Sequence, residues 1–316
     1  MRLEDKIKTL AVETGYTACG LTAAVPFDGY RKAVELHRCR FPEAAALYAG
    51  PLRLADPRAS APWARSIVVC VRRYGKYAIP PGLDDHIGRN YLFDRRHAGC
   101  PDHAMPKRMK EGLRRLGLRV KVGGVPCREA AARAGVAQIA RNCFSYTDAD
   151  GSWINIEAWR VDAELRPDPP TPVSPCPDGC RACLDACPTG ALAEPFLMRM
   201  DRCVAYLTYG APEPIAPELA DRMGPWVYGC DACQRACPLN RGKWKEIERA
   251  PWLESVADCL TPEALADMTD ETFRSTVHPL FGYIPEDQLD RWRRNARRAL
   301  EANRTINHPP IPNHGH

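Results

Sequence analysis

Residues 176–188 read Cys-Pro-Asp-Gly-Cys-Arg-Ala-Cys-Leu-Asp-Ala-Cys-Pro, and residues 230–238 read Cys-Asp-Ala-Cys-Gln-Arg-Ala-Cys-Pro. The two stretches share a pattern, because in each the last cysteine follows an alanine and precedes a proline. One more cysteine, Cys203, stands between them in the sequence Met-Asp-Arg-Cys-Val-Ala-Tyr. Seven cysteines in the two stretches and Cys203 make eight of the fifteen in the chain, all between residues 176 and 237.

The spacing of these cysteines predicts two iron–sulfur clusters. It resembles the bacterial ferredoxin motif, in which three closely spaced thiolates hold one [4Fe–4S] cube and the fourth, before a proline, ligates the other cube. The second stretch is one cysteine short, and Cys203 supplies the missing ligand. The predicted ligands are Cys176, Cys180, Cys183 and Cys237 for one cluster, and Cys187, Cys203, Cys230 and Cys233 for the other. Such a protein transfers single electrons.

Zinc and disulfides are weaker explanations of the same cysteines. A zinc site favours two pairs of ligands across a modest loop and does not require proline after the last cysteine. Disulfides are disfavoured because the N-terminal sequence Met-Arg-Leu-Glu-Asp has no apolar segment of an export signal. The other cysteines stand singly, and we expect small buried apolar groups at Cys19, Cys39, Cys70, Cys100, Cys127, Cys143 and Cys259.

Length and composition indicate a globular protein. The chain has 316 residues, of which 45% are hydrophobic and 26% charged, and its formal net charge is +5. No apolar stretch approaches the length of a membrane span, so we expect a cytoplasmic protein with no membrane partner. The arginine-rich stretch 291–298 could meet a phosphate backbone, although a solvated helix face is the favoured explanation.

Prolines divide the chain. The proline-rich segment from Arg166 predicts an extended linker, and the sequence before it predicts alternating helices and strands. We expect helices at 3–14, 106–117 and 127–134, and strands at 66–71, 118–122 and 153–159. Beyond Cys237 we expect one helix capped by Thr261 and another from Pro285 to about residue 302. The predicted division is 1–165, 166–245, a helical segment 246–304 and a disordered tail 305–316.

The residues around the cysteines resemble those of the epoxyqueuosine reductases, iron–sulfur and cobalamin enzymes related to reductive dehalogenases. The resemblance is closest at 180–192, 202–208 and 228–240. It extends to Gly88-Arg-Asn-Tyr, to the stretch 133–142, to Gly151-Ser-Trp and to Arg-Arg-Asn-Ala at 293–296, and so covers most of the chain.

This resemblance implies an α+β fold: a nitroreductase-like α/β domain that binds base-off cobalamin, a ferredoxin-like double [4Fe–4S] module and a small C-terminal helical segment. Electrons from a low-potential donor such as ferredoxin or flavodoxin would pass through both cubes to cobalt. The reduced cobalt would remove the epoxide oxygen of a nucleoside in tRNA, a step of queuosine biosynthesis. The implied cofactor-binding residues are Arg141, Asn142, Tyr206 and Asp231, although each also has an ordinary structural explanation.

The sequence departs from the family in several places. Cys176 lies one residue further from Cys180 than the family spacing, and Pro177-Asp-Gly can form a tight turn that absorbs the insertion. The family's proton-donating aspartate corresponds to Gly123, three residues before Pro126, and glycine cannot donate a proton. Asn90 likewise replaces a family aspartate. The weak candidates for a substitute catalytic acid are Tyr91, Glu129 and Asp85.

Two further readings of the function stay open. Full-length bacterial members continue into helical repeats that grip tRNA, whereas this chain ends soon after Arg304, which weakens the expectation of a tRNA substrate. One alternative is a dehalogenase-like reductase with Tyr91 or Tyr74 as proton donor. The other is a ferredoxin-type electron-transfer protein that reduces a corrinoid partner.

Overall fold

The centre of the fold is a four-stranded antiparallel sheet. The computed structural model describes residues 1–97, 99–172, 174–212, 214–281 and 285–307. The strand order is β1 (Ala18–Ala23), β2 (Ser66–Arg73), β6 (Ile154–Val161) and β3 (Val120–Val122). β2 and β6 pair along their whole length, with Ser66 opposite Val161 and Arg73 opposite Ile154. Every residue of β2 except Arg73 is buried, which explains the uninterrupted apolar run in its sequence.

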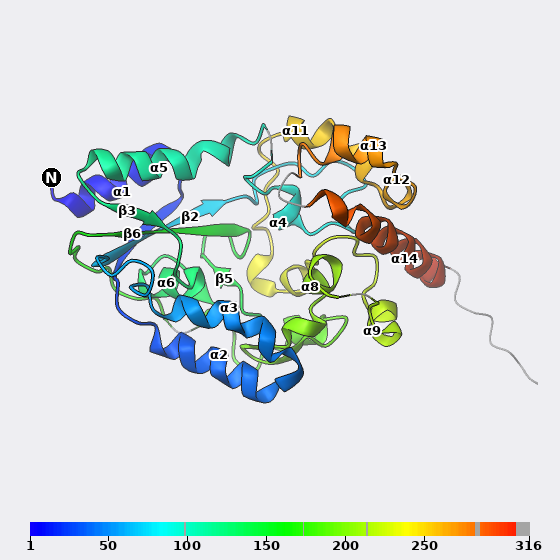
Figure 1. The fold of residues 1–316 in the computed structure, drawn as a ribbon, viewed down its shortest axis with the longest axis horizontal. Helices are drawn as coiled ribbons and strands as arrows, with labels where there is room; N and C mark the ends of the chain where they lie inside the picture. The colour runs from blue at the N-terminus through cyan, green and yellow to red at the C-terminus, as the bar shows by residue number, and fades with distance from the viewer. Residues whose placement is uncertain (98, 173, 213, 282–284, 308–316) are drawn as a thin grey trace, which may run out of the picture.

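Helices cover both faces of this sheet (Figure 1). On one face, α1 (Leu3–Thr14) and α5 (Met105–Arg115) bury Ile7, Met109 and Leu113 against β2 and β6. On the other, α6 (Cys127–Arg133) packs its alanines on the sheet, and α2 (Asp28–Arg40) and α3 (Ala49–Leu52) lie beyond it. The predicted helices at 3–14, 106–117 and 127–134 and the strands at 66–71, 118–122 and 153–159 are therefore confirmed, with ends that shift by a few residues.

The cysteine-rich region consists of short helices and turns. It contains α7 (Ala182–Asp185), the hairpin β7 (Leu192–Glu194) and β8 (Leu197–Met198), α8 (Val204–Tyr209), α9 (Pro217–Arg222) and α10 (Ala232–Arg235). α7 and α10 contact each other. α7 carries Cys183 of the first cysteine stretch, and α10 carries Cys233 of the second. A small hairpin, β4 (Gln138–Ile139) and β5 (Ser145–Tyr146), lies between α6 and β6 in the sequence.

The C-terminal helices pack on the segment that follows β2. They are α11 (Pro251–Glu254), α12 (Pro262–Ala266), α13 (Asp270–Thr272) and α14 (Leu289–Asn307). One apolar core joins α11, α12, α14 and Phe273, which directly follows α13, to residues 74–93, including α4 (Arg89–Leu92). Thr261 caps α12 as predicted, because its Oγ1 accepts a hydrogen bond from the Ala264 amide at 3.2 Å. α14 extends three residues into the predicted tail, of which residues 308–316 lie outside the described part of the chain.

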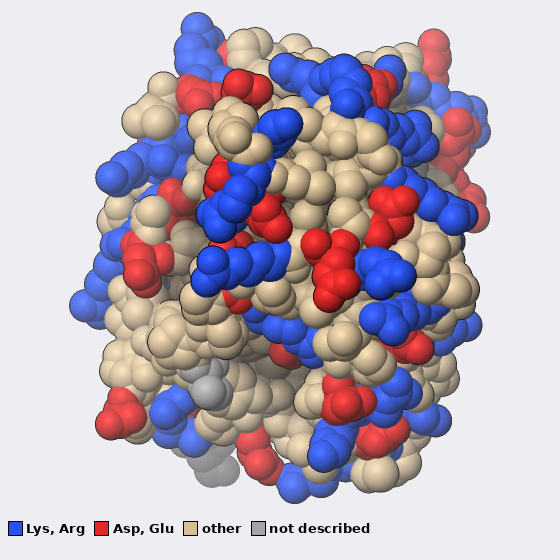
Figure 2. All heavy atoms as spheres, turned by 90° about the vertical axis from the view of Figure 1, so that its left-hand side faces the viewer, with Lys and Arg blue, Asp and Glu red and all other residues tan. Residues whose placement is uncertain are grey.

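Charges are mixed on the surface that lies at the left of Figure 1. There Lys and Arg side chains are interspersed with Asp and Glu side chains (Figure 2), in keeping with the modest net charge of +5. None of the helices in the described ranges is both long enough and apolar enough to cross a membrane.

Candidate functional site

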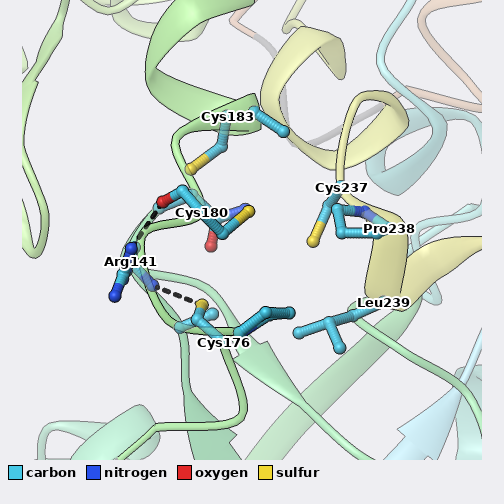
Figure 3. A pocket seen from close by; sticks show the side chains of 11 residues that line it. Arg141, Cys176, Cys180, Cys183, Cys237, Pro238 and Leu239 are labelled. Carbon is cyan, nitrogen blue, oxygen red and sulfur yellow. Dashed lines mark hydrogen bonds between the residues drawn. The ribbon is translucent and has the colours of Figure 1, made fainter.

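Four cysteines from distant parts of the cysteine-rich region surround one small cavity (Figure 3). They are Cys176, Cys180, Cys183 and Cys237, the set predicted to hold the first cluster. Arg141 borders the same cavity: its backbone N–H donates to the Cys176 Sγ at 3.4 Å, and its Nη1 donates to the Cys180 carbonyl at 2.6 Å. Hydrogen bonds to cluster ligands of this kind influence the reduction potential of the cluster.

The extra residue after Cys176 is accommodated by a turn. The Cys180 amide donates to the Pro177 carbonyl at 3.2 Å, and Gly179 has the left-handed φ of 68°. Glycine suits that conformation because it has no Cβ to clash with the backbone. The predicted tight turn is therefore present, and Cys176 lies at the cavity despite the altered spacing.

The thiol electrostatics separate the cysteines into the two predicted sets. Burial and, to a smaller extent, the nearby Cys237, Cys176 and Cys180 together raise the pKa of Cys183 to about 11. Burial likewise raises the pKa of Cys233, and there the contributing thiols are Cys230, Cys203 and Cys187. Mutual repulsion of this kind requires proximity, so each set of four is close together, and bound iron would favour the thiolate form instead. Ligation by these cysteines stays a prediction.

A larger cavity of about 360 Å³ lies beside the second set of cysteines. Cys203 and Cys230 form part of its wall, together with side chains from the sheet, such as Ile154 and Asn155. Tyr74, Tyr91 and Tyr209 line it as well. The cavity therefore lies between the α/β domain and the second predicted cluster.

Two of the four predicted cofactor-binding residues line this cavity. These two are Asn142 and Asp231. The Asn142 Nδ2 donates a hydrogen bond to the Tyr146 hydroxyl at 2.8 Å. Arg141 instead lines the first cysteine cavity, and Tyr206 packs in a small apolar cluster around α8. Tyr209, which the sequence analysis did not select, is in the wall of the larger cavity.

Asp231 connects the second cysteine stretch to the Gly88-Arg-Asn-Tyr stretch. Its side chain is 1% exposed, and its Oδ2 accepts a hydrogen bond from the Arg89 amide at 2.8 Å. Gln234 Nε2 donates to the other oxygen at 3.3 Å. Burial raises the pKa of Asp231 to about 6, against the opposing effect of the Arg89 hydrogen bond.

The three candidate acids lie in different surroundings. Asp85 is an exposed partner of Arg235, at 2.7 Å, and does not line the cavity. Tyr91 lines it, and burial raises the pKa of its hydroxyl well above the usual range. Glu129 lines an adjoining cleft of about 420 Å³.

The positions that replace family aspartates also differ. Asn90 is in the cavity wall, where its Oδ1 accepts from Asn155 Nδ2 at 2.7 Å. Gly123 lies in the loop after β3 with a φ of +64°, and a Cβ there would meet nothing within 4 Å. The carboxyl group expected from the family is thus absent from both places.

Four residues form walls common to the cleft and the cavity: Cys127, Arg128, Cys143 and Met198. None of the four was expected from the sequence to be a site residue, and Cys127 and Cys143 were expected to be isolated buried groups. Cys143 carries one local peculiarity, a left-handed φ of 65°, which is uncommon outside glycine but leaves no mark in the sequence.

Comparison with known proteins identifies the family. Residues 176–240 match the model of the 4Fe-4S double cluster binding domain, which spans all eight predicted ligands. The epoxyqueuosine reductase of Gloeobacter violaceus is 30% identical over 322 residues, covering 94% of this chain and 95% of that protein. The chain belongs to the epoxyqueuosine reductase family. The Bacillus subtilis epoxyqueuosine reductase is 27% identical over 252 residues, which cover 77% of this chain and 64% of the relative.

Solved epoxyqueuosine reductases have the same fold. A structure of the Bacillus subtilis enzyme, with its catalytic aspartate loop swung out of the active site, aligns with a TM-score of 0.76 at 25% identity, over 98% of this chain and 87% of the other. Another, with an epoxyqueuosine-modified tRNA-Tyr stem loop, gives a TM-score of 0.78 over 95% of this chain and 81% of the other. The predicted α+β fold with a double [4Fe–4S] domain is confirmed, and the chain is a member of a family of reductases.

Proposed function

We propose that this reductase passes single electrons from its [4Fe–4S] clusters to a cobalamin in the 360 Å³ cavity, and reduces epoxyqueuosine in tRNA or another small electrophile in the cytoplasm. The observation that carries the proposal is the place of Cys203 and Cys230 in the cavity wall. A cluster on these ligands would border whatever the cavity binds. A low-potential ferredoxin or flavodoxin would supply the electrons.

The residues of the cavity fit a corrinoid. A corrin ring carries carboxamide groups around its rim, and the cavity offers the amides of Asn90, Asn142 and Asn155. The Ser145 Oγ, also in the wall, is buried and has no hydrogen-bond partner among the described residues, so it is available to a ligand. The adjoining volumes of about 360 and 420 Å³ are in the range of cofactor sites.

The chain's own groups would prepare the site for reduction. A bound cobalamin supplies a cobalt centre that becomes strongly nucleophilic when reduced. Tyr74, Phe144 and Ile154 contribute apolar walls to the cavity, which would limit the access of water to a bound ligand and so the side reactions of reduced species. Asp231 fixes the second cysteine stretch against α4 through the Arg89 amide.

A tRNA substrate is supported by the relative solved with an epoxyqueuosine-modified stem loop. A specific observation favours a second candidate, reduction of a different electrophile with a tyrosine as proton donor. This observation is the glycine at position 123, together with Tyr74 and Tyr91 in the cavity wall.

The decisive experiment is anaerobic reconstitution with iron and sulfide, followed by titration with cobalamin. We expect tight binding and a visible spectrum that changes to those of Co(II) and Co(I) on reduction. Protein that holds both clusters but binds no cobalamin would overturn the proposal and leave the electron-transfer protein as the explanation. With cobalamin bound, conversion of epoxyqueuosine-containing tRNA, followed by mass spectrometry of the nucleosides, tests the substrate.

A further inference from the structure

We propose that Glu129 donates the proton to the departing substrate oxygen, in the role that the family assigns to the aspartate replaced here by Gly123. The inference rests on the proposed function of the site. It makes Glu129 a catalytic residue and places the substrate's reacting end where the 420 Å³ cleft meets the 360 Å³ cavity.

The proposed reaction requires an acid. Reduction of an epoxide to an alkene breaks both bonds to the oxygen, forms a carbon–carbon double bond and releases water. It consumes two electrons, which the external donor supplies singly through the clusters, and two protons. The oxygen is a poor leaving group unless it is protonated as its bond to carbon breaks.

The other carboxyl groups near the site are already committed. Asp231, the carboxyl group in the wall of the 360 Å³ cavity, accepts hydrogen bonds from the Arg89 amide and Gln234, and it stands between two predicted cluster ligands. Asp85 forms an ion pair with Arg235 at the surface. Neither is placed to give a proton to a substrate.

Other titratable groups in the walls are less suited to the task. In His37 the Nδ1 bonds the Ala33 carbonyl at 2.6 Å and the Nε2 accepts from the Met198 amide at 3.2 Å. That pattern belongs to a ring whose single N–H group already donates a hydrogen bond to the backbone. Burial raises the pKa of Cys143 to about 11, and it raises that of Tyr91 still further beyond the range of an efficient acid at neutral pH.

Glu129 combines access with the right acidity. It is the third residue of α6, it lines the cleft, and no hydrogen bond or ion pair of its carboxylate is found in the described ranges. Burial raises its pKa above the usual value for glutamate, although Arg133 and Arg128 on the same helix oppose the shift. Tyr30 on α2 and Cys143 in the loop after β4 are the other titratable groups that face it.

Glu129 is also connected to the outside. It lines a second cleft of about 290 Å³, which shares Tyr30 and Ile139 with the first and is bounded by Pro170 and Thr171 of the linker. After giving the first proton to the oxygen, the carboxylate can take a proton from solvent through this outer cleft and give the second. The two protons and two electrons then balance the loss of oxygen as water.

The test compares Glu129→Gln with Glu129→Asp and with Glu35→Gln, an exposed glutamate on α2. In a single turnover of epoxyqueuosine-containing tRNA, we expect Glu129→Gln to lower the rate by about 10²–10⁴-fold, the usual contribution of general acid catalysis. Glu129→Asp should retain part of the rate and Glu35→Gln all of it. Cluster content, cobalamin affinity and cobalt reduction should be unchanged in all three variants.

Restoring the family acid provides a second arm. Gly123→Asp in the Glu129→Gln background returns an acid to the position of the family aspartate, and we expect it to recover part of the rate. The substitution can be accommodated, because a Cβ at 123 meets nothing within 4 Å and aspartate tolerates a left-handed backbone. A Glu129→Gln rate within about threefold of the unmodified protein would overturn the inference, as would loss of cobalamin binding in that variant.

Infrared titration of the cofactor-free protein separates this inference from the proposed function. The difference between unmodified protein and Glu129→Gln should show a protonated carboxyl band that persists above the usual glutamate range. If the unmodified protein does not reduce epoxyqueuosine, the proposed substrate is wrong, and this band alone decides the acid. A Glu129 that ionises at or below the usual glutamate pKa would rule it out as the proton donor.

Discussion

Replacing Asn295 by leucine should release the second predicted cluster while leaving the first in place. Asn295 lies on α14 with its side chain 0% exposed, in the Arg-Arg-Asn-Ala stretch. Its Nδ2 donates to the Thr208 carbonyl and to the Val227 carbonyl, each at 2.9 Å. The Thr208 Oγ1 in turn accepts from the Gly229 amide at 2.9 Å.

These bonds hold the chain on both sides of the second set of cysteines. Thr208 belongs to α8, which begins directly after Cys203, and Val227 and Gly229 lead into Cys230. Leucine has a similar volume but no donor, so two buried carbonyl groups would lose their partner. At about 1–2 kcal/mol for each, the free energy of unfolding should fall by about 2–4 kcal/mol.

The assay is anaerobic reconstitution, with iron counted per chain and urea unfolding followed by circular dichroism. We expect iron to fall from about eight to about four atoms per chain, because each [4Fe–4S] cube holds four. Asp290→Asn is the matched control on the same helix, since its exposed ion pair with Arg293 contributes little to stability. A full complement of iron with unchanged stability in Asn295→Leu would refute the reasoning.

Three other perturbations have defined outcomes. Cys176→Ala should lose the first cluster, and retention of about eight irons per chain would show that this assignment is wrong. Gly124→Ala should destabilise the protein by more than Gly123→Ala, because its Cβ would meet the Arg160 Nη2 at 2.3 Å whereas one at Gly123 meets nothing within 4 Å; equal unfolding midpoints would contradict this. Burial lowers the pKa of His86, so the folded state favours its neutral form. The contribution of His86 to the free energy of unfolding is therefore fully present above the ordinary histidine pKa and is lost as the pH falls below it. His86→Gln should reduce the loss of stability at acid pH, measured as the unfolding free energy against pH. An unchanged pH dependence would contradict the lowered pKa of His86.

Local patterns in the sequence were sufficient to group the cysteines into two predicted sets and to place α1, α5, α6, α12, α14, β2, β3 and β6, whereas β1, α2 and the short elements of the cysteine-rich region were not predicted. Cysteine spacing and a following proline are features of a few consecutive residues, and the periodicity of apolar residues belongs to a single element. The wall of the cavity depends instead on how elements from different parts of the chain meet. Tyr206 and Tyr209 are three residues apart on a six-residue helix, and only the packing of α8 decides that Tyr209 lines the cavity.

A similar limit applies at Arg141 and Asn142. These neighbours in the sequence contact different cavities: Arg141 faces the first set of cysteines, and Asn142 reaches the larger cavity as well. The left-handed backbone at Cys143 directly follows them and redirects the chain, and no residue type there announces that turn. Family resemblance therefore pointed to a loop that borders both cavities, whereas only the structure shows which cavity each of the adjacent side chains lines.

Under the proposed function, the arrangement of the two sets of cysteines would give electron flow a direction. Each cysteine stretch contributes its last thiol to the set that the other stretch begins, Cys187 to the second set and Cys237 to the first, so the predicted clusters are fixed close together. The second set alone has members, Cys203 and Cys230, in the wall of the 360 Å³ cavity. Under the proposed function, an electron bound for the cavity would leave through the second cluster, and the first would receive it from the external donor. The C-terminal helix would then support this pathway, because Asn295 holds the segments that carry Cys203 and Cys230, the thiols in the cavity wall.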